Sequence, residues 1–159
     1  MTASSSHAAR HRARRLLLQA LYQWHVGGDD PHEIIVQFVE QRATDGVDLS
    51  YFEEAMRTLA AEPSRFDQVI EPLLQRSLAL VDPVERAVLR IAAYELLERF
   101  EIPARVVINE AIELAHEFGS EQGHRFVNGV VDRLAHGIRR HELGSSAASS
   151  NDDDPGAAS

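Results

Sequence analysis

The segment at residues 83–100, PVERAVLRIAAYELLERF, constrains the fold more than any other part of the chain. On a helical wheel at about 100° per residue, its apolar side chains point in nearly every direction. They are Val84, Val88, Leu89, Ile91, Ala93, Tyr94, Leu96, Leu97 and Phe100. A helix that is apolar all round must be covered on all sides by other elements. We therefore expect a central helix around which the rest of the chain packs.

The segment HRFVNGVVDRL, at residues 124–134, decides between a strand and a helix. Asn-Gly between valines is typical of a two-residue β-hairpin. On a helical wheel, however, one arc collects Val127, Val130, Val131, Leu134 and Ile138. No alternating pattern of comparable length occurs. The segment is therefore predicted to be helical through Asn128 and Gly129, and the fold to be all-α.

Helix boundaries are marked by capping residues, by prolines, and by glutamates three positions after a cap. Helix starts are predicted at or next to Asp30, Ser50, Ser64, Asp82 and Pro103. Pro72 should kink or split the helix that begins near Ser64. Gly119 should end the helix that begins at Pro103. This reading gives six or seven helices joined by short loops.

Length and composition predict one compact domain with two tails. The chain has 159 residues, of which 44% are hydrophobic, so one core is expected, over residues 10–143. Residues 1–9 and the acidic stretch 144–159 hold few apolar groups and are expected to be disordered. Cysteine is absent, which excludes disulfides, thiolate catalysis and cysteine zinc sites. No apolar stretch is long enough to span a bilayer, so we expect no association with a membrane. We expect the protein to be cytoplasmic.

The charge of the chain is unevenly distributed. The formal net charge is −9, yet residues 10–15 read RHRARR and no acidic residue precedes Asp29. A basic arm is therefore followed by an acidic body. The basic residues are all arginine, which suits bidentate contacts with phosphate, although a biased genome composition would have the same result.

Two aromatic residues lie beside arginines at the edge of predicted apolar arcs. Tyr22 shares a flank of the first helix with Arg12 and Arg15, opposite the core arc. Phe126 lies off the valine arc of the last helix, near Arg125 and Gly129. Arginine on phosphate and an aromatic ring under a base are typical of single-stranded RNA binding. The ordinary structural alternative places both rings at the edge of the core.

The best enzymatic candidate is a repeated Glu-x-x-His spacing, which supplies ligands in di-iron helix bundles. It occurs at Glu113 and His116 and again at Glu121 and His124. Ligands must project into the core, whereas Glu113 lies almost opposite the apolar arc of its helix. We therefore expect these side chains to be solvated, and we expect no catalytic residue, metal or cofactor. The sequence also contains no phosphate-binding loop and no nucleophile elbow. A metal enzyme and a helical interaction module without RNA binding are the alternatives.

Residues 84–134, together with RRLLLQALYQW at residues 14–24, resemble the NusB family of bacterial transcription antitermination factors. The run INEAIELA followed by FVNGV carries the resemblance most specifically. It implies two helical subdomains that bind boxA RNA of ribosomal RNA operon leaders and pair with the ribosomal protein NusE. It further implies action in a complex of Nus factors and RNA polymerase, and leaves a homodimer open.

The resemblance also implies site residues. The RNA-binding residues would be Arg10, Arg12, Arg14, Arg15, Tyr22, Gln122, Arg125 and Phe126. Glu85 would face the ribosomal partner. Some relatives carry an acid where this chain has Gln122, and a lysine where it has Arg125, so both departures are expected to tighten RNA binding or change which nucleotide is favoured.

Overall fold

The structure is a computed structural model that describes residues 3–143, and within them it contains helices and no strand. The α-helices are α1 (Ala3–Gly27), α2 (Pro31–Gln41), α3 (Leu49–Ala61), α4 (Pro63–Ile70), α5 (Pro83–Glu98), α6 (Ala104–Phe118), α7 (Glu121–Ile138) and α8 (Arg140–Leu143). Two short 3-10 helices, η1 (Glu71–Leu73) and η2 (Leu78–Leu80), connect α4 to α5. The all-α prediction is confirmed.

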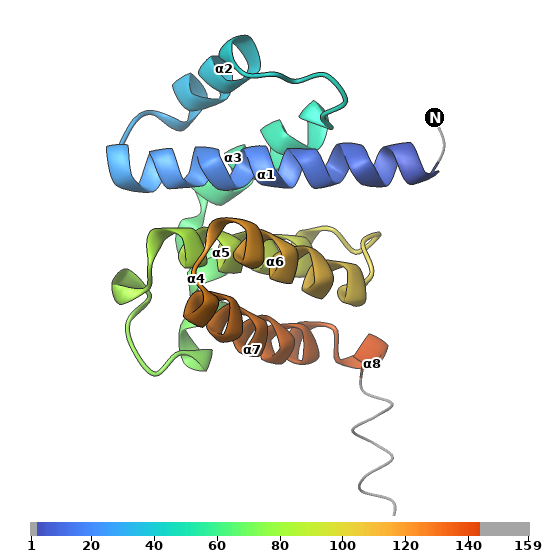
Figure 1. The fold of residues 1–159 in the computed structure, drawn as a ribbon. Helices are drawn as coiled ribbons and strands as arrows, with labels where there is room; N and C mark the ends of the chain where they lie inside the picture. The colour runs from blue at the N-terminus through green and yellow to red at the C-terminus, as the bar shows by residue number, and fades with distance from the viewer. Residues whose placement is uncertain (1–2, 144–159) are drawn as a thin grey trace, which may run out of the picture.

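The helices form two subdomains, which Figure 1 shows one above the other. The first consists of α1, α2 and α3, and the second of α4 to α7 with α5 at its centre. Helix α5 packs against α1, α4, α6 and α7, and most of its residues from Arg86 to Leu96 are buried. The all-round apolar pattern of this segment therefore identified the central helix correctly.

Most helix boundaries follow the predicted signals. The carboxylates of Asp30 and Asp82 cap α2 and α5, and Pro72 lies in η1 directly after α4 ends. Helix α7 runs without a break through Asn128 and Gly129. The start predicted at Ser50 was wrong by two residues, because Asp48 lies upstream and its carboxylate accepts the backbone N–H of Tyr51.

The first helix begins earlier than expected. It starts at Ala3, so most of the tail predicted over residues 1–9 is helical. The carbonyl of Ala9 accepts a hydrogen bond from the backbone N–H of Asp48 at 3.0 Å, which anchors the start of α1 to the α2–α3 loop. Residues 1–2 and the predicted tail at 144–159 lie outside the described residues. No helix in the described part of the chain has the length and apolar character needed to cross a membrane.

Candidate RNA interface

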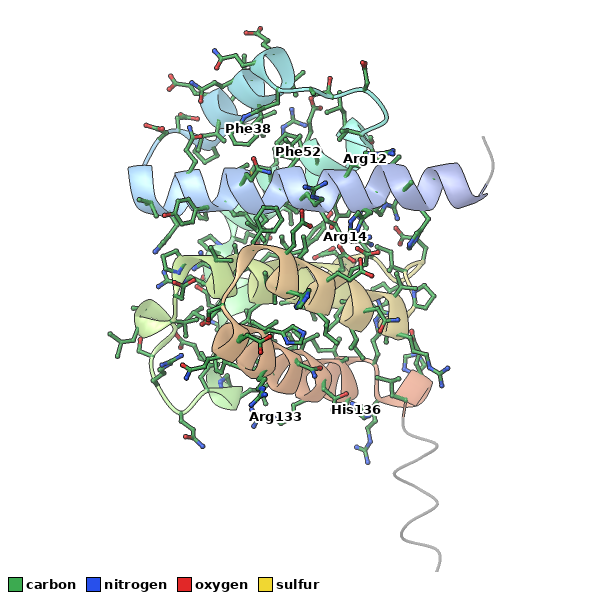
Figure 2. The ribbon with its side chains drawn as sticks, in the orientation of Figure 1. Arg12, Arg14, Phe38, Phe52, Arg133 and His136 are labelled. Carbon is green, nitrogen blue, oxygen red and sulfur yellow. The ribbon has the colours of Figure 1, made fainter. Side chains whose placement is uncertain are left out.

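The arginines of the basic arm differ in their surroundings, and Figure 2 shows Arg12 and Arg14 on opposite sides of α1. Arg12 is exposed, and its Nη1 donates to the Gly46 carbonyl at 3.2 Å. Arg15 is also exposed and pairs with Glu117 at 2.6 Å. Arg10 is half-buried, with Nη2 3.4 Å from Asp48 Oδ2. Arg12 and Arg15 are therefore the members of the arm best able to meet a phosphate.

The prediction that Arg14 contacts RNA needs correction, because its side chain lies in the protein interior. It is 1% exposed, and its Nε and Nη2 donate to the two carboxylate oxygens of Glu95 at 2.7 and 3.0 Å. Burial alone would lower the pKa of Arg14, but the hydrogen bond and charge of Glu95 outweigh it and raise that pKa. A guanidinium held in this way cannot reach a phosphate at the surface.

Tyr51 on α3 also contacts the buried pair of Arg14 and Glu95. The hydroxyl of Tyr51 donates to the same Glu95 carboxylate, and burial raises the pKa of Tyr51 well above its ordinary value. The sequence contains a signal for this interior position of Arg14. Leu17, Leu18 and Leu21 follow it by three, four and seven residues, and all are buried, so Arg14 belongs to the apolar face of α1.

Tyr22 borders a hollow of about 520 Å³ between α1, α5 and α6. Its side chain is 43% exposed. The other residues around the hollow include Leu18, Val26, Arg42, Val84 and Phe118. Tyrosine and phenylalanine with an arginine nearby suit a nucleic-acid base and its phosphate. Phe118 and Arg42 were not among the predicted residues, because their proximity to Tyr22 arises from tertiary packing.

A second patch lies on α7. Gln122 and Arg125 are exposed, whereas Phe126 is half-buried against the core. The guanidinium of Arg76, from the loop between η1 and η2, lies 5.1 Å from the centroid of the Phe126 ring. Arg76 was not predicted, because it is 50 positions away from Phe126 in the sequence. Open space surrounds the position where a Cβ at Gly129 would stand, so this part of α7 is accessible.

Glu85, the predicted partner-binding residue, lies beside the α7 patch. A Cβ at Gly123 would overlap the Glu85 carboxylate, so the two helices approach closely there. Burial raises the pKa of Glu85, the negative charge of Asp82 adds to that effect, and Arg76 opposes it. The second patch is therefore bordered by a carboxylate, and any partner that contacts Glu85 comes close to Arg76.

The two Glu-x-x-His pairs do not assemble into a di-iron type site in the described residues. The rings of His116 and His124 do meet, with centroids 5.2 Å apart. Glu113, however, is 64% exposed and lies 3.8 Å from Nδ1 of His11 on α1. The group of possible ligands that the fold brings together consists instead of His11, Glu110 and Glu113.

Comparison with known proteins connects this geometry to a family. The NusB family model matches residues 11–136. The transcription antitermination protein NusB of Xanthomonas euvesicatoria is 50% identical over 140 residues, which cover 88% of this chain and 86% of the relative. NusB of Shewanella amazonensis is 47% identical over 125 residues, which cover 79% of this chain and 93% of the relative.

Solved structures agree with these matches. A NusB structure from T. maritima superposes with a TM-score of 0.71 at 34% identity, over 79% of this chain and 89% of that one. A crystal structure of the antitermination factors NusB and NusE with double-stranded RNA shares the fold, with a TM-score of 0.70 at 24% identity over 86% and 99% of the two chains. The family is one of transcription antitermination factors, so the prediction that the chain is not an enzyme is confirmed. The chain belongs to the NusB family.

Proposed function

We propose that this protein binds boxA RNA of ribosomal RNA operon leaders, pairs with the ribosomal protein NusE, and acts as an antitermination factor with RNA polymerase in the cytoplasm. The observation that carries the proposal is the exposed face of α1. On it, Arg12 and Arg15 are exposed, and Tyr22 borders a hollow that Phe118, a second aromatic residue, also lines.

The contacts that these arginines make within the protein are replaceable by RNA. Arg15 pairs with Glu117 while both side chains are about two-fifths exposed, and ion pairs of this kind contribute only about 0–1 kcal/mol. Arg12 donates to a single backbone carbonyl at the surface. Phosphate contacts supply most of the affinity of proteins for nucleic acid. Exchange of these weak contacts for phosphates is therefore favourable.

The α7 patch offers a second contact for the same RNA. Arg125 is exposed, and Arg76 lies over one side of the Phe126 ring. Two separate patches favour an extended single strand, whose unstacked bases can reach one aromatic residue after another. In this arrangement Tyr22 stacks on one base, and Phe126 packs against another at its exposed edge.

The partner proposal rests on relatives and on charge. The neighbouring NusB structure was solved with NusE. The net charge of −9 gives this chain an acidic body, and opposite fields accelerate association with a basic ribosomal protein. Glu85 is half-buried at the start of α5 and is our candidate for contact with NusE.

Salt-dependent RNA binding tests the role of the arm. We expect Arg12→Ala/Arg15→Ala to weaken binding of a boxA-like single strand in gel shifts. The slope of log affinity against log salt should become shallower by roughly 1.4, since each lost phosphate contact removes about 0.7. Arg57→Ala on α3, which also removes an exposed arginine, is the control and should leave the slope unchanged. An unaltered slope in the double variant would contradict the proposal.

The same assay with NusE present tests the partner site. Glu85→Arg should abolish the gain in RNA affinity that NusE confers, because a positive charge would then face a basic partner. RNA binding by the isolated variant should be kept. Loss of binding in both assays, with an unchanged circular dichroism spectrum, would assign Glu85 to the RNA surface instead.

A further inference from the structure

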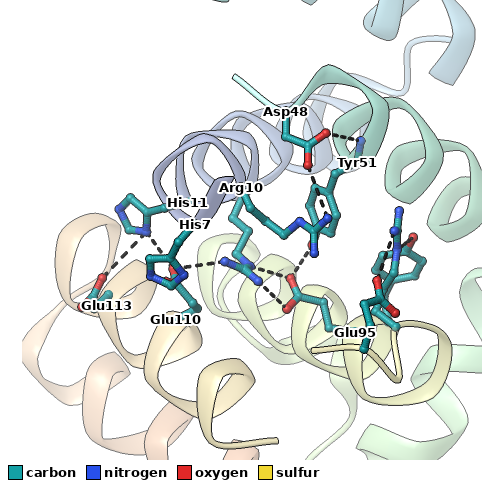
Figure 3. A network of polar contacts seen from close by, with 12 residues as sticks. His7, Arg10, His11, Asp48, Tyr51, Glu95, Glu110 and Glu113 are labelled. Atoms are coloured by element: carbon teal, nitrogen blue, oxygen red, sulfur yellow. Dashed lines mark hydrogen bonds and ion pairs between the residues drawn. The ribbon is translucent and has the colours of Figure 1, made fainter. Parts of the chain in front are cut away.

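We propose that the protein binds one Zn²⁺ ion between α1 and α6, at His7, His11, Glu110 and Glu113. Figure 3 shows these four side chains converging where the first turns of α1 cross α6. This set shares only Glu113 with the two Glu-x-x-His pairs, and none of its four residues is assigned to the proposed RNA or partner site.

The distances between the possible ligand atoms suit one small cation. Nδ1 of His11 lies 2.7 Å from Glu110 Oε2 and 3.8 Å from Glu113 Oε2. Nε2 of His7 lies 3.5 Å from Glu110 Oε1. In a tetrahedral zinc site with metal–ligand bonds near 2.1 Å, neighbouring ligand atoms are roughly 3.4 Å apart. The three observed distances lie on either side of that value. Ligand atoms of His11, Glu110 and Glu113 already lie within 4.8 Å of one another, and a rotation of the exposed His7 side chain would add the fourth ligand.

The sequence spacing places the ligands on facing sides of two rigid helices. His7 and His11 are four residues apart on α1, and Glu110 and Glu113 are three apart on α6. Residues three or four apart share one face of a helix, and zinc sites use histidine pairs of this spacing. Two imidazoles with two carboxylates favour Zn²⁺ over Mg²⁺ or Ca²⁺, which prefer sites made of oxygen alone.

The charge around Glu110 leaves its carboxylate available to a cation. The nearest fixed cation is Arg14, whose Nη1 is 3.6 Å from Glu110 Oε2. That Nη1 is buried and makes no hydrogen bond in the structure, while Nε and Nη2 of the same guanidinium are committed to Glu95. The oxygens of Glu110 lie near the two histidines, and Glu95 balances more of the guanidinium charge than Glu110 does.

A bound ion would connect the two subdomains. The histidines belong to the first turns of α1, directly before and within the basic arm, and the glutamates belong to the second subdomain. Four protein ligands leave no open coordination position, which is typical of structural and not of catalytic zinc. The ion would hold the start of α1 against α6 and so fix the direction of the arm.

Calorimetric titration of the tag-free, chelator-treated full chain with Zn²⁺ tests the site. We expect binding of one equivalent, and with Co²⁺ the intense visible absorption of a tetrahedral complex. His11→Ala and Glu113→Gln should each weaken Zn²⁺ binding by at least about tenfold, since even indirect support of a ligand is worth 10–100-fold. Glu113 is 64% exposed, so its conservative replacement leaves the fold intact.

The matched control is His136→Ala. His136 lies 3.7 Å from Asp132 on α7, a histidine–carboxylate pair without the further ligands, and its loss should leave Zn²⁺ affinity unchanged. Absence of stoichiometric binding by the wild-type chain would overturn the proposal. Equal weakening in His136→Ala and His11→Ala would also overturn it, because the ion would then be held by surface histidines in general.

Discussion

The two aromatic residues of the proposed RNA surface differ in how far each contributes to the core. Tyr22 is 43% exposed and stands at the rim of a hollow. Phe126 is half-buried, packs against the core cluster, and has the Arg76 guanidinium 5.1 Å from its ring centroid. Tyr22 is therefore available to contact RNA, whereas Phe126 also contributes to the packing of the core.

This difference predicts distinct outcomes for two alanine variants. Tyr22→Ala should lose about 1–3 kcal/mol of RNA-binding free energy, the usual value of one stacked base, with little change in the free energy of unfolding. Phe126→Ala should lower both quantities, because it also leaves a cavity next to the core. Chemical denaturation and RNA titration at one fixed salt concentration measure the two effects. Wild-type RNA affinity in Tyr22→Ala would remove this residue from the interface.

Among the helices, α7 combines a well-buried face with an accessible one. Val127, Val130 and Val131 are buried, while Gly129 is exposed and a Cβ there would meet no atom within 4 Å. A glycine inside a helix costs about 1 kcal/mol relative to alanine. Packing does not require this glycine, and its position one helix turn from Phe126 leads us to explain it by close approach of a ligand.

Gly129→Ala tests that explanation. The variant should unfold with a free energy higher by up to about 1 kcal/mol, and it should bind RNA more weakly, because the added methyl group stands beside Phe126. Gly137→Ala on the same helix is the control, since Gly137 is also exposed and its Cβ position is open. It should leave RNA binding unchanged. If Gly129→Ala binds RNA like the wild type, the α7 patch does not form part of the RNA surface.

At the scale of the whole molecule, local signals predicted the helices but not the contacts between them. Apolar periodicity identified α5 as central and α7 as helical, and the Asp-Pro pairs at Asp30 and Asp82 marked two helix starts. These signals involve residues within one helix turn of each other. The bond between Arg14 and Glu95 joins positions 81 residues apart, so the family resemblance left Arg14 among the RNA-binding arginines.

The contacts of Arg139, near the other end of the helical region, could likewise not be predicted from the local sequence. Arg139 is fully buried and donates to the carbonyl oxygens of Glu95, Leu96 and Arg99 at the end of α5, and to that of Ile102 beyond it. Its guanidinium therefore binds carbonyls of the last turn of α5, including that of Glu95, which also accepts the backbone N–H of Arg99. Nothing in the local sequence HGIRRHEL distinguishes Arg139 from its exposed neighbour Arg140 as the buried one.

The buried contact between Arg14 and Glu95 joins the first subdomain to the second, which makes it a test of how the molecule holds together. Arg14→Ala should lower the free energy of unfolding by about 3–5 kcal/mol, because it leaves the Glu95 carboxylate buried without its counter-ion. Arg15→Ala, one residue further on the exposed face, should change it by no more than about 0.5 kcal/mol. Urea denaturation followed by far-ultraviolet circular dichroism measures both. Equal stability of the two variants would contradict the buried position of Arg14.

Replacing Arg14, Glu95 and Tyr51 together tests whether the stability lost in Arg14→Ala comes from the unpaired buried charge. Arg14→Met/Glu95→Leu/Tyr51→Phe removes both charges and the hydroxyl that donates to Glu95, so each of these hydrogen bonds loses donor and acceptor together. Glu110 loses the Arg14 charge 3.6 Å away but keeps its hydrogen bond with His11. Burying apolar groups of similar volume in place of an ion pair is often neutral or stabilising. We therefore expect the triple variant to recover most of the stability lost in Arg14→Ala, and to keep the RNA affinity of the wild type, because Arg12, Arg15 and Tyr22 are unchanged. A stable triple variant with impaired RNA binding would instead show that the buried pair sets the direction of α1 and, through it, the position of the arm.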